Sequence, residues 1–122
     1  MNECIYLIDK DPAIVDVISL LLADEGYTTV IAQKPFEIQD VKMAKPKLIL
    51  LHNGLDNIGQ QICMELKADS ELSKIPILMS STNTNLQQVA QECGAEAYIS
   101  KPFDLNEFSN MVRQLLSKNT AT

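Results

Sequence analysis

The sequence predicts a doubly wound α/β domain, with a five-stranded parallel sheet covered by helices on both faces. Short apolar runs alternate along the chain with longer segments in which apolar residues recur at helical spacing. The runs at 4–8 and 47–51 show no alternation with polar residues, which is typical of strands buried on both faces. Short connections complete the pattern, and parallel strands joined by helices require right-handed crossovers.

The first strand, predicted at 4–8, ends abruptly at a polar segment that begins with Asp9. A helix is expected to follow, because Asp11 can cap its first turn and Pro12 suits its first position. Apolar residues then recur at helical spacing until Gly26, which is expected to end the helix.

The next unit contains a strand over 27–32, where β-branched residues are frequent, and a weaker helix from about 36 to 44. A third strand is predicted at 47–51, directly after a proline. His52 follows this run, so the histidine is expected at the carboxyl end of a strand, where turn residues begin.

The second half of the chain repeats the alternation. A helix is predicted over about 58–69, and a fourth strand over 75–79. The polar cluster 80–85 can supply a cap for the helix that follows, and Gly94 marks the end of that helix. A fifth strand predicted at 95–99 completes the sheet.

A capping box marks the start of the last helix, with Asp104 followed three residues later by Glu107. The 122 residues match the size of one domain with one sizeable core. We therefore expect a single domain over 1–118 and a frayed tail over 119–122.

The amino-acid composition of the chain disfavours several classes of function. Ten basic and sixteen acidic residues give a net charge of −6, which disfavours binding to nucleic acid or to an anionic membrane surface. The three cysteines form no CxxC motif, and we interpret them as packing residues. The chain lacks the basic start of a secretory signal and an apolar run of ~20 residues, so we expect a cytoplasmic protein.

Ligands of doubly wound sheets bind beyond the carboxyl ends of the strands, where the strand order reverses. Four segments of this chain are expected there, at 9–11, 52–54, 80–82 and 100–102. They contain an acidic cluster, a histidine, hydroxyl groups and a lysine. The functional side chains are therefore sought at this edge of the sheet.

Several motifs, in this order and at this spacing, resemble the receiver domain of two-component response regulators. The likeness covers essentially the whole chain and includes the acidic cluster after the first strand. It rests most on Pro-Lys-Leu-Ile-Leu-Leu at 46–51, Ile-Pro-Ile-Leu-Met at 75–79 and Gly-Ala-Glu-Ala-Tyr-Ile-Ser-Lys-Pro-Phe at 94–103. The resemblance implies a CheY-like, flavodoxin-like three-layer sandwich with strand order 2-1-3-4-5, which agrees with the periodicity.

The resemblance also implies a phosphorylation site, from which this chain departs. In typical receivers two adjacent acids after the first strand, together with an aspartate that ends the third strand, bind Mg²⁺. That aspartate accepts a phosphoryl group from a histidine kinase. The adjacent acids correspond to Asp9 and Lys10, and the acceptor corresponds to His52. The Gly54 carbonyl and the Lys101 ammonium group match the family pattern, but with two carboxylates missing no catalytic residue, metal or other cofactor is expected.

Charge counting supports the loss of Mg²⁺. Asp9, Lys10, Lys101 and a neutral His52 carry a net charge of +1, and Asp11 brings it to zero if its side chain points inward. Mg²⁺ prefers anionic oxygen ligands, so such a pocket offers it little. We expect Asp9 to contact Lys101, because a lysine buried beside an acid is costly to leave unpaired. Lys10 either pairs with one of the two aspartates or points into water.

His52 is open to two interpretations. It could accept a phosphoryl group or act as a pH-sensitive group, since an ordinary imidazole titrates near neutrality. The interpretation we favour is a neutral side chain that fills the vacated pocket. Asp56 is the other alternative acceptor, although its displacement along the loop favours a solvated turn residue.

Ser81 and Tyr98 match the hydroxyl group and the aromatic residue that couple the site to a partner surface in typical receivers. That surface comprises the fourth helix, the fifth strand and the fifth helix. Both residues also have ordinary explanations, Ser81 as a helix cap and Tyr98 as a half-buried strand residue. The expected partner is a protein, such as a histidine kinase or an output protein.

These observations predict a degenerate receiver domain, a protein-interaction module that signals without phosphorylation and is not an enzyme. The first alternative is a receiver that still accepts a phosphoryl group on His52 or Asp56. The second is a flavin or small-anion binder on the same fold. That alternative is weaker, because segment 9–12 has carboxylates and a proline where a phosphate needs amide donors.

Overall fold

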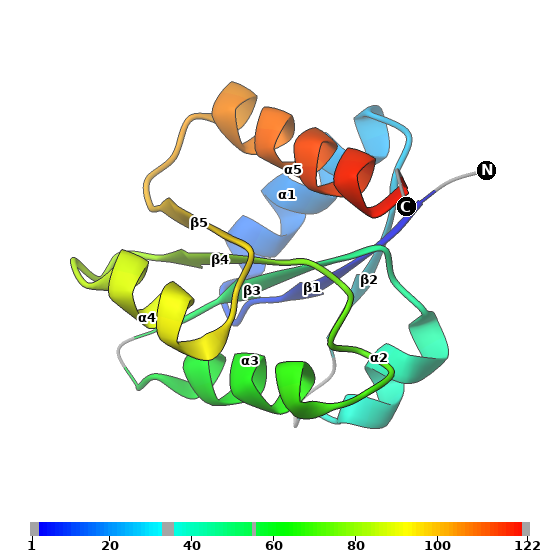
Figure 1. The fold of residues 1–122 in the computed structure, drawn as a ribbon. Helices are drawn as coiled ribbons and strands as arrows, with labels where there is room; N and C mark the ends of the chain where they lie inside the picture. The colour runs from blue at the N-terminus through cyan, green and yellow to red at the C-terminus, as the bar shows by residue number, and fades with distance from the viewer. Residues whose placement is uncertain (1–2, 33–35, 55, 121–122) are drawn as a thin grey trace.

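The computed structural model describes residues 3–32, 36–54 and 56–120. Its five strands form one parallel sheet in the order β2-β1-β3-β4-β5, with helices on both faces (Figure 1). The predicted doubly wound, five-stranded fold is therefore confirmed. In chain order the elements are β1 (Cys4–Ile8), α1 (Pro12–Asp24), β2 (Thr28–Ile31), α2 (Ile38–Ala44), β3 (Leu48–His52), α3 (Ile58–Ala68), β4 (Ile77–Ser81), α4 (Leu86–Cys93), β5 (Ala97–Ser100) and α5 (Leu105–Thr120).

The sheet separates two hydrophobic cores, because successive strand residues point to opposite faces. One core lies under α1 and α5, and the other lies under α2, α3 and α4 on the opposite face (Figure 1). Strand β3 shows the alternation: Leu48 and Leu50 belong to the first core, whereas Ile49 and Leu51 belong to the second. A strand buried on both faces leaves no place for an unpaired polar side chain before its end.

Helix α1 begins and ends as the sequence predicts. Asp11 is its N-cap, and the Asp11 carboxylate accepts a hydrogen bond of 3.0 Å from the backbone N–H of Ala13. Pro12 occupies the first turn, where its missing N–H removes no helical hydrogen bond. Gly26 follows the helix with φ of +90°, a left-handed conformation that glycine adopts readily. The short β1–α1 loop, which carries part of the candidate site, is thus held by its own cap.

The strand boundaries differ in part from the prediction. Strands β4 and β5 begin two residues later than predicted and also end later, and β3 includes His52. Pairing explains these shifts, since His52 lies opposite Ser80 and Ser81 lies opposite Ser100 in the parallel ladders. Polar residues at the strand ends therefore continue the sheet where a partner backbone lies beside them. Strand β2 and helix α2 are slightly shorter than predicted.

The cap of α4 also differs from the expectation. Asn85 is the N-cap of α4 and makes no side-chain cap hydrogen bond. Ser81 still belongs to β4, and its Oγ accepts the backbone N–H of Asn83 at 3.0 Å. The interpretation of Ser81 as a helix cap is therefore wrong, because the residue ends a strand well before the helix begins.

The last helix starts as predicted and continues further. The Asp104 carboxylate accepts backbone N–H groups of the first turn, that of Glu107 among them at 3.2 Å. The helix extends to Thr120, so half of the expected tail 119–122 is helical, and the last two residues lie outside the described part of the chain. None of the described helices is long and apolar enough to cross a membrane.

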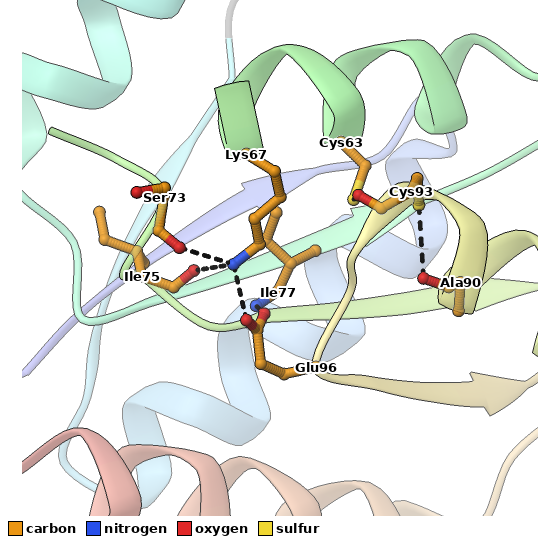
Figure 2. Close-up of polar contacts among 8 residues, drawn as sticks. All are labelled: Cys63, Lys67, Ser73, Ile75, Ile77, Ala90, Cys93 and Glu96. Atoms are coloured by element: carbon orange, nitrogen blue, oxygen red, sulfur yellow. Dashed lines mark hydrogen bonds and ion pairs between the residues drawn. The ribbon is translucent and has the colours of Figure 1, made fainter. Parts of the chain in front are cut away.

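One lysine holds the outer helical layer to the sheet. Figure 2 shows the Lys67 ammonium group of α3 donating to the backbone carbonyls of Ser73 and Ile75, both at 3.0 Å, and to a Glu96 carboxylate oxygen at 2.7 Å. The other Glu96 oxygen accepts the backbone N–H of Ile77 at 2.8 Å. These bonds tie α3 to the start of β4 and to the residue that precedes β5.

The cysteines pack in the interior, as expected. Cys63 of α3 and Cys93 of α4 are buried, and the Cys63 thiol donates to the Cys93 carbonyl at 3.4 Å (Figure 2). Burial raises the pKa of the Cys63 thiol and that of Cys4. A raised pKa keeps the thiols of Cys4 and Cys63 protonated, and protonated thiols are poor nucleophiles.

The first turn of α3 approaches β3 so closely that only glycine fits at position 59. A Cβ atom on Gly59 would lie 2.4 Å from the His52 carbonyl oxygen and 2.7 Å from the Asn53 Cα. Both are backbone atoms, so relief of the clash requires a shift of the strand end itself. Gly59 therefore sets the distance between α3 and the end of the strand that carries His52.

We predict that Gly59→Ala lowers the free energy of unfolding by about 1–3 kcal/mol, the range typical of overpacked sites. Alanine is otherwise the better helix former by about 1 kcal/mol, so a loss of stability identifies the backbone clash as the cause. Urea denaturation measures the difference. Gln61→Ala, at an exposed position of the same helix, is the control and is expected to change stability by less than about 0.5 kcal/mol. Equal stability of the two variants would show that α3 can move away from β3 without cost.

Candidate functional site

The ends of four strands bring the candidate residues to one edge of the sheet. Asp9 directly follows β1 and His52 ends β3, and the parallel register of these strands places the two residues at the same level. Ser81 ends β4, and Lys101 directly follows β5. All four residues lie at the carboxyl edge, where the sequence analysis expects them.

A buried ion pair spans this edge. The Lys101 Nζ lies 2.9 Å from the Asp9 Oδ2, and the two side chains are only 12% and 3% exposed. The Asp9 Oδ1 accepts the backbone N–H of Asp11 at 3.0 Å. Both oxygens of Asp9 are thus engaged within the protein, which offsets part of the cost of burying its charge. The contact expected between Asp9 and Lys101 is present.

Lys10 has a partner that the sequence analysis did not assign. Its Nζ lies 2.9 Å from the Oδ2 of Asp56 in the β3–α3 loop, and the side chains are 63% and 47% exposed. Asp9 is already paired with Lys101, and Asp11 caps α1, so neither is free for Lys10. The expected pairing with Asp9 or Asp11 is therefore wrong. The hydrogen bond from Lys10 also lowers the pKa of the Asp56 carboxyl group.

Asn53 organises the β3–α3 loop, a role that the sequence analysis missed. It is 1% exposed, its side-chain oxygen accepts the backbone N–H of Gln60 at 2.8 Å, and its own N–H donates to the Ser80 carbonyl at 2.8 Å. The carbonyl of Gly54, the candidate backbone ligand, accepts the N–H of Asn57 at 3.1 Å. The only signal in the sequence was an amide residue next to a buried strand end, which is too common to identify such a bond.

His52 is a neutral side chain at the centre of the site. Burial lowers the pKa of its imidazole, and the Lys101 ammonium group lowers it further, against smaller opposing effects of Asp9, the Ser80 carbonyl and Asp56. An ordinary histidine has a pKa of about 6.5, so His52 is uncharged at pH 7. Its Nδ1 is buried, and in the described part of the chain it has no partner in hydrogen-bond geometry. The direction of this shift fits a neutral imidazole, and the filling of the pocket by His52 stays a prediction.

The two candidate switch residues have contrasting environments. Ser81 is 1% exposed, and its bond to the Asn83 N–H stabilises the start of the β4–α4 loop. Tyr98 of β5 is 39% exposed and presents its ring at the surface, as expected of a half-buried strand residue. Ser81 is therefore engaged within the protein, whereas Tyr98 is accessible at the surface.

The donors at this edge do not fit Mg²⁺, which prefers a near-octahedral set of hard, anionic oxygens. Both oxygens of Asp9 are engaged, and Lys10 and His52 supply no carboxylate. In the residues that the structure describes, no group of three His, Cys, Asp or Glu side chains could hold a metal ion. With Asp56 included, the carboxylates of Asp9, Asp11 and Asp56 and the ammonium groups of Lys10 and Lys101 give this edge a net charge of −1. This charge is spread over two ion pairs and a helix cap. The sequence analysis expected a net charge of +1 or zero.

Comparison with known proteins gives one family. Residues 5–113 match the family model described as the response regulator receiver domain. The matched segment includes every candidate residue of the site, from Asp9 to Lys101.

Individual proteins are also similar to this chain in sequence. The chain is 35% identical over 118 residues to the DNA-binding dual master transcriptional regulator RpaA of Synechocystis sp., covering 93% of this chain and 49% of that protein. It is 32% identical over 123 residues to the DNA-binding response regulator MtrA of Mycolicibacterium smegmatis, covering 98% and 53%. It is 29% identical to the sporulation initiation phosphotransferase F of Bacillus subtilis, covering 95% of each. The chain thus spans about half the length of the first two relatives.

Solved structures share the fold. A CheY-like receiver domain protein from Methanospirillum hungatei superposes with a TM-score of 0.87 at 22% identity, covering 99% of this chain and 98% of that one. The chemotaxis response regulator CheY4 of Vibrio cholerae gives a TM-score of 0.83 at 20% identity, covering 94% and 99%. At these identities the likeness concerns the fold alone.

We predict that Lys101→Met lowers the free energy of unfolding at pH 7 by about 3 kcal/mol, because it leaves the buried Asp9 carboxylate without its cation. The double variant Asp9→Asn, Lys101→Met removes both charges and should recover most of that loss. Urea denaturation of the wild type and the variants measures the coupling. The control is Lys10→Met, which breaks an exposed ion pair and should have a far smaller effect. Equal losses for Lys101→Met and Lys10→Met would contradict the prediction.

A second prediction concerns pH. Because His52 is the only histidine of the chain, its ring protons report its pKa directly by NMR, and we expect a midpoint below about 6.5. Unfolded His52 takes up its proton at a higher pH than folded His52, so stability falls as the pH drops from about 6.5 towards the lowered pKa. His52→Gln should remove this part of the pH dependence. A titration midpoint of His52 at or above 6.5 would contradict the prediction.

Proposed function

The chain belongs to the response regulator receiver domain family, and from this membership we propose that it is a pseudo-receiver, a module that signals without being phosphorylated. It acts as a protein-interaction domain of two-component signalling and not as an enzyme. His52 ends β3, where the resemblance to typical receivers places the phosphoacceptor aspartate. Lys10 stands at the position of one of the two acids that follow β1.

The buried ion pair between Asp9 and Lys101 carries this proposal. Asp9 is the remaining carboxylate of the family's metal site, and both of its oxygens are bonded within the protein. A Mg²⁺ ion bound to Asp9 would lie close to the Lys101 ammonium group, 2.9 Å from the Asp9 Oδ2, and the two positive charges would repel each other. We therefore propose that Mg²⁺ binding is lost. A two-state switch cannot be shifted by an absent ligand, so the resting conformation is the working one.

The proposed partner is a protein that binds the surface formed by α4, β5 and α5. Tyr98 and Leu105 of this surface are 39% and 45% exposed, and tyrosine is one of the residues that most often anchor interfaces. A histidine kinase or an output protein fits the family role. The net charge of −6 disfavours nucleic acid and anionic membranes as direct partners. The three unpaired cysteines suit the reducing cytoplasm, where we place the protein.

The competing function is phosphoryl transfer to His52 or Asp56. The Asp56 carboxylate is held by Lys10 at 2.9 Å and by the backbone N–H of Ile58 at 3.1 Å. His52 lies near Lys101 but has no Mg²⁺ site beside it. These contacts favour the pseudo-receiver over a receiver with a substitute acceptor.

We predict that acetyl phosphate with Mg²⁺ adds no phosphoryl group to the wild-type chain, because the edge lacks two of the three carboxylates of typical receivers, the acceptor among them. Intact-mass spectrometry measures the modification. Mg²⁺ alone should leave the amide NMR signals of Asp9, Lys10, His52 and Gly54 unmoved.

The matched positive variant is Lys10→Asp, His52→Asp. It restores three carboxylates beside Lys101, a net charge of about −2, and should show saturable Mg²⁺ shifts and gain one phosphoryl group. Phosphorylation of the wild type would overturn the proposal, and the labelled peptide would name the acceptor. A double variant that fails to bind Mg²⁺ would assign the loss to the β3–α3 loop instead of the two substituted residues.

A further inference from the structure

A cavity of about 480 Å³ opens beside the candidate site, next to the ends of β1 and β3 and the first turns of α3. Its apolar lining comes from Ile8, Ala32, Phe36, Ile58 and Ile62, and four charged residues, Asp9, Lys10, Asp11 and Asp56, also line it and are called its rim below. Cavities of roughly 300–1,000 Å³ with apolar walls and a few polar groups are typical of small-molecule sites. The described residues thus supply a concave, apolar space that phosphorylation chemistry does not explain.

Small residues keep this space open. Gly54 lines the cavity without a side chain, and a Cβ atom there would lie 3.5 Å from Asp56 Oδ1 and 3.7 Å from His52 Nε2, two residues that also line it. Ala32 contributes only a methyl group. Ile58 is 41% exposed, so apolar surface at the cavity remains in contact with water. Transfer of such surface from water to an apolar ligand is favourable.

The charged groups at the rim are already satisfied. Asp9 is paired with Lys101, Lys10 is paired with Asp56, and Asp11 caps α1. A strongly charged ligand would have to compete with one of these contacts or remain unpaired in a largely apolar space. The cavity therefore favours an uncharged occupant.

His52 supplies a polar group for that occupant. A neutral imidazole carries a proton on one ring nitrogen and a free lone pair on the other. The Nδ1 is buried and has no hydrogen-bond partner among the described residues, so no protein acceptor or donor fixes the tautomer and the proton can reside on Nδ1. The Nε2 lies on the side of Gly54, 3.7 Å from the place of a Cβ atom there, and both residues line the cavity. Nε2 is thus placed to accept a hydrogen bond from a ligand.

We propose that this cavity binds a small, uncharged aromatic molecule of about two fused rings that donates one hydrogen bond to the His52 Nε2. The rings pack against the apolar lining, and the donor group reaches the edge of the sheet. This binding site goes beyond the proposed function, because it does not depend on whether the chain has lost phosphorylation.

The test is a titration of the whole chain with indole and, separately, with 1-methylindole, followed by amide NMR. The two compounds share the fused rings, but only indole carries the N–H donor. We expect saturable shifts at residues that line the cavity, among them Ile8, Gly54, Gly59 and Ile62. Indole should bind about fivefold more tightly than 1-methylindole, a factor typical of one neutral hydrogen bond.

Four variants separate the contributions. His52→Ala should remove the preference for indole while 1-methylindole still binds. Ala32→Phe fills the cavity and should abolish binding of both compounds. Ile58→Ala should weaken both, whereas Val17→Ala should weaken neither, since Val17 is similarly exposed at 47% but lies on α1 and not among the cavity residues. Circular dichroism confirms that each variant is folded.

The absence of saturable shifts with both compounds overturns the proposal. Equal effects of Ile58→Ala and Val17→Ala also overturn it, because they indicate adsorption to any apolar surface. If Ala32→Phe does not fold, the titrations of His52→Ala and Ile58→Ala still show whether the compounds bind in this cavity. Phosphorylation of the wild type by acetyl phosphate would overturn the proposed function and leave this inference standing, so the two failures can be told apart.

Discussion

Burial of the central strands β1, β3 and β4 on both faces is the constraint on which the rest of this structure depends. Ile5, Leu50 and Leu78 are at most 3% exposed, and a polar side chain among them would lose its hydration without a partner. Polar chemistry is therefore confined to the strand ends. Parallel pairing then gathers these ends at one edge, where Asp9 and Lys101 meet although 92 positions separate them in the sequence.

The ion pair at that edge determines its electrostatics. The Lys101 ammonium group neutralises Asp9 and helps to keep the neighbouring imidazole of His52 uncharged. A similar geometry with carboxylates in place of Lys10 and His52 would be strongly negative and would favour a divalent cation. In this chain Lys10 and His52 occupy two of these positions, and Asp9 is paired with Lys101.

The contact between α3 and β3 determines the shape of the site. Gly59 allows the helix to approach the strand, and Asn53 fixes the loop between them through Gln60 and the Ser80 carbonyl. This loop also holds Asp56, whose pair with Lys10 forms part of the cavity rim. This one loop therefore contributes both an ion pair at the edge and part of the lining of the cavity.

Local sequence determined much of this protein. The apolar runs, the cap at Asp11 and the left-handed turn at Gly26 depend on neighbours a few positions away, and these features predicted the elements and their order. Strand order and charge then predicted the pair between Asp9 and Lys101, because carboxyl ends of parallel strands must share an edge. Only the tertiary structure decided the partner of Lys10, the role of Asn53 and the cavity. Each of these depends on the path of the β3–α3 loop, and that path is set by packing against strands distant in the sequence, which no local pattern encodes.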